Sequence, residues 1–90
     1  MEGITKSGFK FKVDERVRTD WRLTMALTKM ENQKKPMGVL QGINELAELL
    51  LGDQMEAFIN HIEEQNEGFA PMEVVTEELK QIIEQFPKNS

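Results

Sequence analysis

The order of apolar and polar residues predicts a strand near the start of the chain. Residues 9–13 read Phe-Lys-Phe-Lys-Val, the period-two pattern of a strand with one face in water. The Ser-Gly pair at 7–8 is a turn signal, so we expect residues 2–5 to pair back as a β-hairpin. A lone two-stranded hairpin is marginal in water, so we expect it to lie on helices or on another subunit.

The rest of the chain has helical spacing. Apolar residues recur at intervals of three and four over residues 14–31, 37–51, 53–65 and 72–86. The fourth of these segments has its apolar positions at offsets of 0, 3, 7, 10, 11 and 14 from Met72. We therefore expect a mainly α protein: a small four-helix domain with a short N-terminal β-hairpin, spanning residues 1–86.

Capping residues mark where these helices begin and end. Asp14 ends the strand and is placed to cap the first helical segment, and Asp20 allows a break or a second cap within it. Pro36 suits the first turn of the second helix. Gly52 is a natural stop, and Asp53, with a glutamate three residues on, predicts a capping box that starts the third helix.

Two glycines interrupt the most apolar helical segment. Gly38 and Gly42 lie inside the second predicted helix, where glycine lowers helix stability. Either this helix begins late or close packing requires a position without a side chain.

Length and composition exclude several classes of protein. Ninety residues are enough for one domain, and 39% hydrophobic with 30% charged residues is ordinary for a folded soluble chain. The absence of cysteine removes disulfides, thiolate nucleophiles and zinc–cysteine sites. No apolar run approaches the ~20 residues of a membrane span, and the first residues lack the order of a signal peptide. We expect a cytoplasmic protein that does not contact membranes.

Charge is divided unevenly along the sequence. Residues 1–35 hold nine Lys/Arg and five Asp/Glu, a net +4, whereas residues 36–90 hold two and eleven, a net −9. A basic first third and an acidic remainder favour head-to-tail self-association, so we expect a homo-oligomer. The alternative is that both segments are simply solvated faces.

The sequence offers few residues that could act in catalysis or bind a metal. His61 is the single histidine, and no second histidine or cysteine accompanies it for a metal site. The pairs Glu63-Glu64 and Glu77-Glu78 point in different directions on a helix and read as solvated charge. Gly38 and Gly42 lack the Gly-Lys-Ser/Thr ending of a phosphate loop. We expect no enzyme activity, no cofactor and no bound metal.

Nucleic-acid binding is weakly supported. Two helices joined at Gly52 suggest a helix-turn-helix, but residues 53–67, which would read the DNA, hold five acidic residues and no Lys or Arg. Such a helix repels phosphates. A small DNA-binding regulator stays open as an alternative, although we expect no nucleic-acid partner.

Short motifs along the chain resemble those of one family. They are Phe-Lys-Phe-Lys-Val-Asp at 9–14, Asp-Trp-Arg-Leu at 20–23, Leu-Leu-Leu-Gly-Asp-Gln-Met-Glu-Ala-Phe at 49–58, Phe-Ala-Pro-Met-Glu-Val-Val-Thr-Glu-Glu-Leu at 69–79, and Lys-Asn-Ser at 88–90. In this order they are similar to the short tail assembly chaperones of long-tailed phages and prophages of Gram-positive bacteria. The resemblance runs from about residue 8 to the end of the chain.

The resemblance implies a function and a partner. Such chaperones bind the long helical tape measure protein in the host cytoplasm and keep it soluble until tail tube subunits polymerise around it. A helical client would lie in an apolar groove and be read at spacings of three and four. Large or adaptable residues suit such contacts. We expect Trp21, Met25, Met30 and Phe58 to make them, although each is also a candidate core residue. A stoichiometric inhibitor or immunity module is the other alternative.

The resemblance also implies a longer form of the protein. In the family, a programmed ribosomal slip near the end of the short protein produces a second length. Residues 87–89, Pro-Lys-Asn, can be encoded by a heptamer that allows such a slip. Because the polar tail 87–90 follows the last predicted helix, an added arm would leave the domain undisturbed, and it could contact the tail tube protein.

Overall fold

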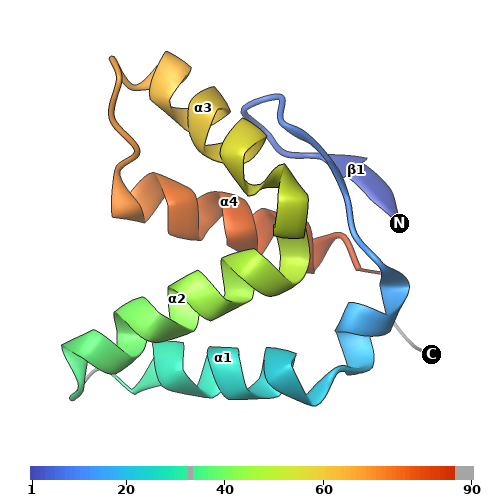
Figure 1. Ribbon diagram of the computed structural model, residues 1–90, viewed down its shortest axis with the longest axis vertical. Helices are drawn as coiled ribbons and strands as arrows, with labels where there is room; N and C mark the ends of the chain where they lie inside the picture. Colours follow the sequence, from blue (N-terminus) through green and yellow to red (C-terminus); the bar gives the residue numbers. More distant parts are fainter. Residues whose placement is uncertain (33, 87–90) are drawn as a thin grey trace.

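The computed structural model describes residues 1–32 and 34–86, and this part of the chain is mainly helical with an antiparallel hairpin at its start (Figure 1). Strand β1 (Glu2–Ile4) pairs with β2 (Lys10–Lys12), with Gly3 opposite Phe11. The predicted hairpin and its inward face are confirmed, because Phe9, Phe11 and Val13 are all buried.

The first predicted helix is divided in two. A 3-10 turn, η1 (Glu15–Thr19), precedes helix α1 (Trp21–Glu31). The Asp14 carboxylate accepts a hydrogen bond from the Arg16 backbone N–H at the start of η1, and Asp20 accepts one from Arg22 N–H at the start of α1. The sequence allowed for this break, and both aspartates cap as predicted.

No loop separates helix α2 (Pro36–Leu51) from helix α3 (Met55–Gln65). The 3-10 turn η2 (Gly52–Gln54) joins them, so residues 36–65 form one bent helical run. With α1 and α4 (Met72–Glu84), the described chain has three runs of α-helix where the sequence predicted four separate helices. Gly52 closes α2 at φ +51°, a backbone conformation that residues with a side chain rarely adopt.

The predicted capping box at the start of α3 is wrong. Asp53 lies inside η2, and the residue that precedes α3 is Gln54, which makes no side-chain capping bond. Gln54 instead binds the hairpin. Its side chain accepts from Lys12 N–H at 2.8 Å and donates to the Lys12 carbonyl at 2.6 Å. The bend therefore serves as an anchor for β2.

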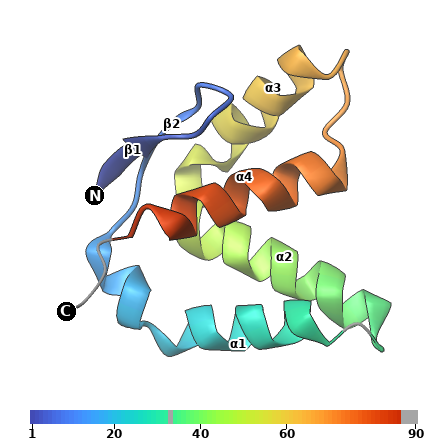
Figure 2. The same ribbon diagram turned by 180° about the vertical axis from the view of Figure 1, so that it is seen from behind.

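The helices stack around α4, which lies between the α2 and α3 arms of the bent run (Figures 1 and 2). Helix α1 packs along α2 on one side, and the hairpin lies beside α3 on the other. All elements except β1 and η2 supply buried apolar side chains to one core, which comprises Phe9, Phe11, Val13, Val17, Leu23, Ala26, Leu46, Ala47, Leu50, Leu51, Phe58, Ile62, Leu79 and Ile82.

The close contact between α1 and α2 explains one of the two glycines. A Cβ built on Gly42 would lie 2.7 Å from the Ala26 carbonyl oxygen and 2.9 Å from the Met30 side chain. A Cβ on Gly38 would meet only Lys35, at an ordinary 3.5 Å. Close packing therefore requires glycine at position 42 and not at position 38.

Candidate functional site

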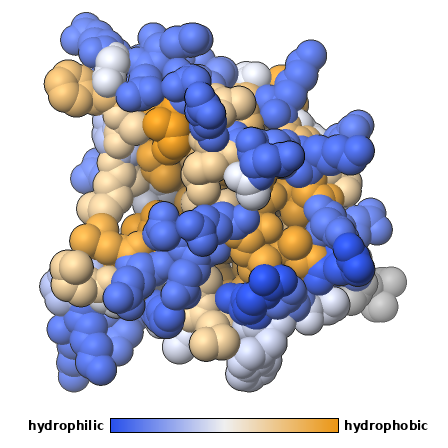
Figure 3. All heavy atoms as spheres, in the orientation of Figure 1, coloured by the Kyte–Doolittle hydropathy of each residue, from blue (hydrophilic) through white to orange (hydrophobic). Residues whose placement is uncertain are grey.

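The bent helical run leaves an apolar groove on the surface. The groove has a cavity volume of about 480 Å³ and is walled by α2, the bend, α3 and the start of α4. Figure 3 shows apolar side chains gathered between α2 and α3 on the face that Figure 1 presents. The residues that line this apolar groove are Leu40, Ile43, Asn44, Ala47, Glu48, Gly52, Met55, Ile59, Met72 and Val75.

The groove follows from the composition of α2. Most positions of this helix are apolar, so apolar side chains remain on the groove side after α1 and the core are covered. The α2 stripe that lines the groove carries residues 40, 43, 44, 47 and 48, the spacing of one helical face over about two turns. Leu40, Ile43 and Ala47 are its apolar members, and Asn44 and Glu48 are its polar members. Gly52 then turns the chain so that α3 rises away from α4, which opens the space between them.

Large apolar side chains on the groove wall are left in water. Leu40 is 42% exposed and Met72 is 53% exposed. Met37, one helical turn before Leu40, and Phe69, in the loop before α4, are also exposed. Exposed apolar side chains such as Leu40 and Met72, gathered along one groove, are typical of a surface that binds another protein.

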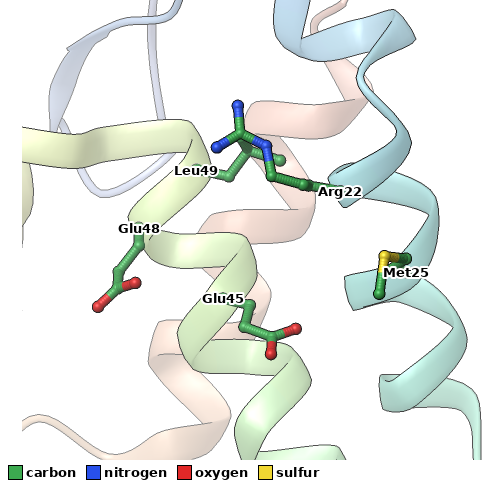
Figure 4. Close-up of a pocket in the computed structure, with 5 residues that line it drawn as sticks. All are labelled: Arg22, Met25, Glu45, Glu48 and Leu49. Atoms are coloured by element: carbon green, nitrogen blue, oxygen red, sulfur yellow. The ribbon is translucent and has the colours of Figure 1, made fainter.

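A second hollow lies between α1 and α2, with a volume of about 510 Å³ (Figure 4). Arg22 and Met25 line it from α1, and Glu45, Glu48 and Leu49 line it from α2. Figure 4 shows the Glu45 side chain on the side of α2 that faces α1, with Met25 on α1 and Glu48 on the opposite side of α2. Glu48 therefore stands on the ridge between this hollow and the apolar groove, which it also lines.

Cations near the second hollow already have partners. Arg22 pairs with Asp20 at 2.7 Å, and Lys29 pairs with Glu45 at 2.7 Å across the two helices. The hollow is therefore a polar surface whose charges are largely satisfied. It offers less apolar area to a partner than the groove does.

The four residues predicted to contact a client lie in different places. Trp21 is 72% exposed at the start of α1, and Met25 is exposed on the same helix face, in the second hollow. Met30 is half-buried and packs against the core near Gly42. Only Trp21 and Met25 are thus brought together on the surface.

Phe58 belongs to the core and not to a binding surface. Its side chain is 0% exposed, and its ring meets that of Phe9 edge-on, with centroids 5.1 Å apart. Residues 55, 58, 59 and 62 share the apolar side of α3. The hairpin segment contacts Phe58 through Phe9, whereas Met55 and Ile59 line the groove. Sequence periodicity identifies the apolar side of the helix, but it cannot tell which of its residues the hairpin covers and which line the groove.

A polar cluster under the hairpin corrects another prediction. Glu78, expected to be solvated, is 3% exposed. Its Oε1 atom accepts hydrogen bonds from the hydroxyls of Thr5, at 2.8 Å, and Ser7. The neighbouring Glu77 is exposed, as predicted. Glu78 therefore holds the hairpin turn against α4.

His61 completes this cluster from α3. Its Nε2 atom lies 3.1 Å from both the carbonyl oxygen and the hydroxyl oxygen of Ser7, and the tautomer of the ring sets which of these contacts is the hydrogen bond. Ser7 lies between His61 and Glu78, whereas in a Ser-His-acid triad the histidine lies between the other two. The order of these three residues therefore differs from that of a triad, and their contacts tie the hairpin turn to α3 and α4.

Within residues 1–32 and 34–86, no group of three or more His, Asp or Glu side chains is placed to hold a metal ion. The helices of the same residues are too short or too polar to span a membrane. Comparison of the chain with protein-family models, with curated proteins and with solved structures finds no match.

Proposed function

We propose that this protein is a phage tail assembly chaperone that binds a helical segment of the tape measure protein in its apolar groove. The apolar groove between α2, α3 and α4 is the observation that carries the proposal. The motif resemblance at 9–14, 20–23, 49–58 and 69–79 supplies the identity of the client. Binding keeps the apolar stripe of the client out of water while tail tube subunits assemble around it.

The groove suits a helix better than an extended peptide. Its walls are themselves helices, and its α2 stripe spans about two turns, which matches client side chains at i, i+3, i+4 and i+7. An extended peptide would need an open sheet edge. The short hairpin gives little of one, because its strands have three residues each.

The alternative of a DNA-binding regulator receives little support. The helix that would enter the major groove, α3, carries Glu56, Glu63 and Glu64 and no Lys or Arg. The apolar side of α3 packs against the hairpin at Phe58 and lines the apolar groove at Met55 and Ile59.

Co-expression tests the proposed function. Wild type should keep the tape measure protein soluble, and the double variant Leu40→Ser/Met72→Ser should lose most of this effect. Both side chains are exposed, so the fold should survive the change. Ile4→Ser is the matched control, because Ile4 is an equally exposed apolar residue on the hairpin, outside the groove. Full solubilisation by the folded double variant would contradict the proposal.

A longer form that contacts the tail tube protein is part of the same proposal. Residues 87–90, where its arm would begin, lie outside the described residues. The codons for Pro87–Asn89 test it. A heptamer A AAA AAC with a long overlapping −1 frame supports the longer form, and any codons that break the heptamer contradict it.

A further inference from the structure

The walls of the apolar groove carry charge of one sign only. Residues 36–65, which form α2, the bend and α3, include six acidic residues and neither Lys nor Arg. On α3, Glu56 and Glu63 lie three residues before and four residues after Ile59, so they flank it on the helix surface. The field along the groove is therefore negative.

Glu48 is an acidic residue that lines the apolar groove itself. It is exposed to water. None of the ion pairs between described residues involves Glu48. Its neighbour Glu45, by contrast, is already paired with Lys29. Glu48 thus presents a negative charge at the rim where a bound helix would place its flanking side chains.

The chain's own basic helix fits this groove poorly. Helix α1 exposes Trp21 and Met25, but Arg22 beside them is bound by Asp20, and Lys29 is bound by Glu45. Docking α1 of a second copy would bring an aspartate to the acidic rim together with Arg22. These local pairs favour a partner whose cations are not already neutralised.

We infer that the groove selects an amphipathic helix of another protein whose apolar stripe is flanked by Lys or Arg, and that Glu48 is the selecting residue. This inference rests on the proposed function, because it names the partner chemistry of the same groove. Lys and Arg are suited to the position. Their aliphatic stems cover apolar surface such as Leu40 and Met72 while the charged heads reach the rim.

Two designed peptides test the inference. Each has about 15 residues, long enough to form a helix, with Leu at i, i+3, i+4 and i+7. One carries Lys at the flanking positions, and the other carries Glu at the same positions. Fluorescence anisotropy gives the dissociation constant of each for the full chain, at about 0.05 M and about 1 M salt.

We expect the Lys peptide to bind at least about tenfold more tightly than the Glu peptide at low salt. The difference should shrink at 1 M salt, where the Debye length is about 3 Å. Glu48→Lys should weaken the Lys peptide about fivefold, the upper range for an exposed ion pair. Glu84→Lys is the matched control. It changes the net charge equally, but Glu84 lies exposed at the far end of α4, outside the groove.

Three results would overturn the inference, and each leaves a different conclusion. Equal binding of both peptides, weakened in both by Leu40→Ser/Met72→Ser, would keep the groove as a helix site and remove the charge selection. If Glu48→Lys and Glu84→Lys weakened the binding of the Lys peptide equally, the peptide would be attracted by the net charge of the protein alone. Self-association of the wild type that Leu40→Ser/Met72→Ser abolishes would make a second copy the occupant of the groove.

Discussion

At the scale of single residues, adjacent identical side chains have opposite environments. Glu77 and Glu78 are neighbours on α4, yet the first is in water and the second is buried beneath the hairpin. A buried carboxylate is stable only when donors surround it. Thr5 and Ser7 supply these donors, so the turn and Glu78 depend on one another.

Glu78→Ala should therefore destabilise the protein by about 1–3 kcal/mol, because it leaves two hydroxyls without their acceptor. Glu77→Ala, which removes the same side chain from the surface, should change stability by less than about 0.5 kcal/mol. Urea unfolding followed by circular dichroism measures both. Equal stability losses in the two variants would mean that Glu78 does not hold the hairpin.

The cap of α1 makes stability depend on acidity. The hydrogen bond from the Arg22 side chain, followed by that from its backbone N–H, lowers the pKa of Asp20 from 3.8 to about 2. Since the folded pKa lies below the unfolded one, the stabilisation is fully present above pH 3.8 and is lost as pH falls through about 2.

Asp20→Ala should accordingly flatten the loss of stability between pH 5 and about pH 2, without abolishing it. Asp14 caps η1 in the same way, and the Arg16 side chain likewise lowers its pKa to about 2. The acid-dependent stabilisation from Asp14 therefore remains in the variant. Thermal melts across this pH range test the prediction. The prediction would be contradicted if the thermal stability of wild type and of Asp20→Ala fell equally as the pH is lowered.

At the scale of elements, the crossing of α1 and α2 depends on the absence of a side chain. Gly42 faces the Ala26 carbonyl, whereas Gly38, four residues earlier on the same helix, faces open space and Lys35. The two glycines look alike in the sequence but have different roles.

Gly42→Ala should destabilise the protein by about 1–3 kcal/mol, because the new methyl group forces the two helices apart. Gly38→Ala should instead be neutral or stabilise by up to about 1 kcal/mol, because alanine favours the helix and nothing obstructs it. Paired denaturation curves test both. Stabilisation by Gly42→Ala would show that the helices do not pack this closely.

At the scale of the whole molecule, the ion pairs leave most of the charge asymmetry in place. Arg16 and Arg22 pair with Asp14 and Asp20, which the net charge of +4 for residues 1–35 already includes. Lys29 pairs across the two segments, with Glu45. The exposed hairpin lysines, Lys10 and Lys12, take part in none of the ion pairs between described residues. Their charges are therefore exposed on the surface, where they can meet the acidic surface of another copy.

We therefore predict self-association that weakens with salt, and Lys10→Glu/Lys12→Glu should weaken it as well. Raising salt from about 0.1 M to 1 M shortens the Debye length from about 10 Å to about 3 Å. Sedimentation velocity over a concentration series at both salt levels measures the effect. A strict monomer from micromolar to millimolar concentration at low salt would contradict the prediction.

The sequence alone determined the local structure. Alternation at 9–13 predicted the hairpin. Helical spacing beyond residue 20, the caps at Asp14 and Asp20, and Pro36 in the first turn of α2 predicted most helix limits. These features depend on neighbours within a few residues, so periodicity and backbone chemistry are sufficient to find them. The prediction of a separate third helix was wrong, because Gly52 and the 3-10 turn η2 bend the helical run without a loop.

Only the tertiary structure decided which apolar residues meet water. Phe58 and Ile59 are adjacent on α3, but the hairpin covers the first and the groove is lined by the second. Glu78 is buried because residues 5–7, more than seventy positions away in sequence, lie over it. Burial depends on which segments pack together across the fold. A periodic pattern gives the faces of each helix but not the element that covers each face.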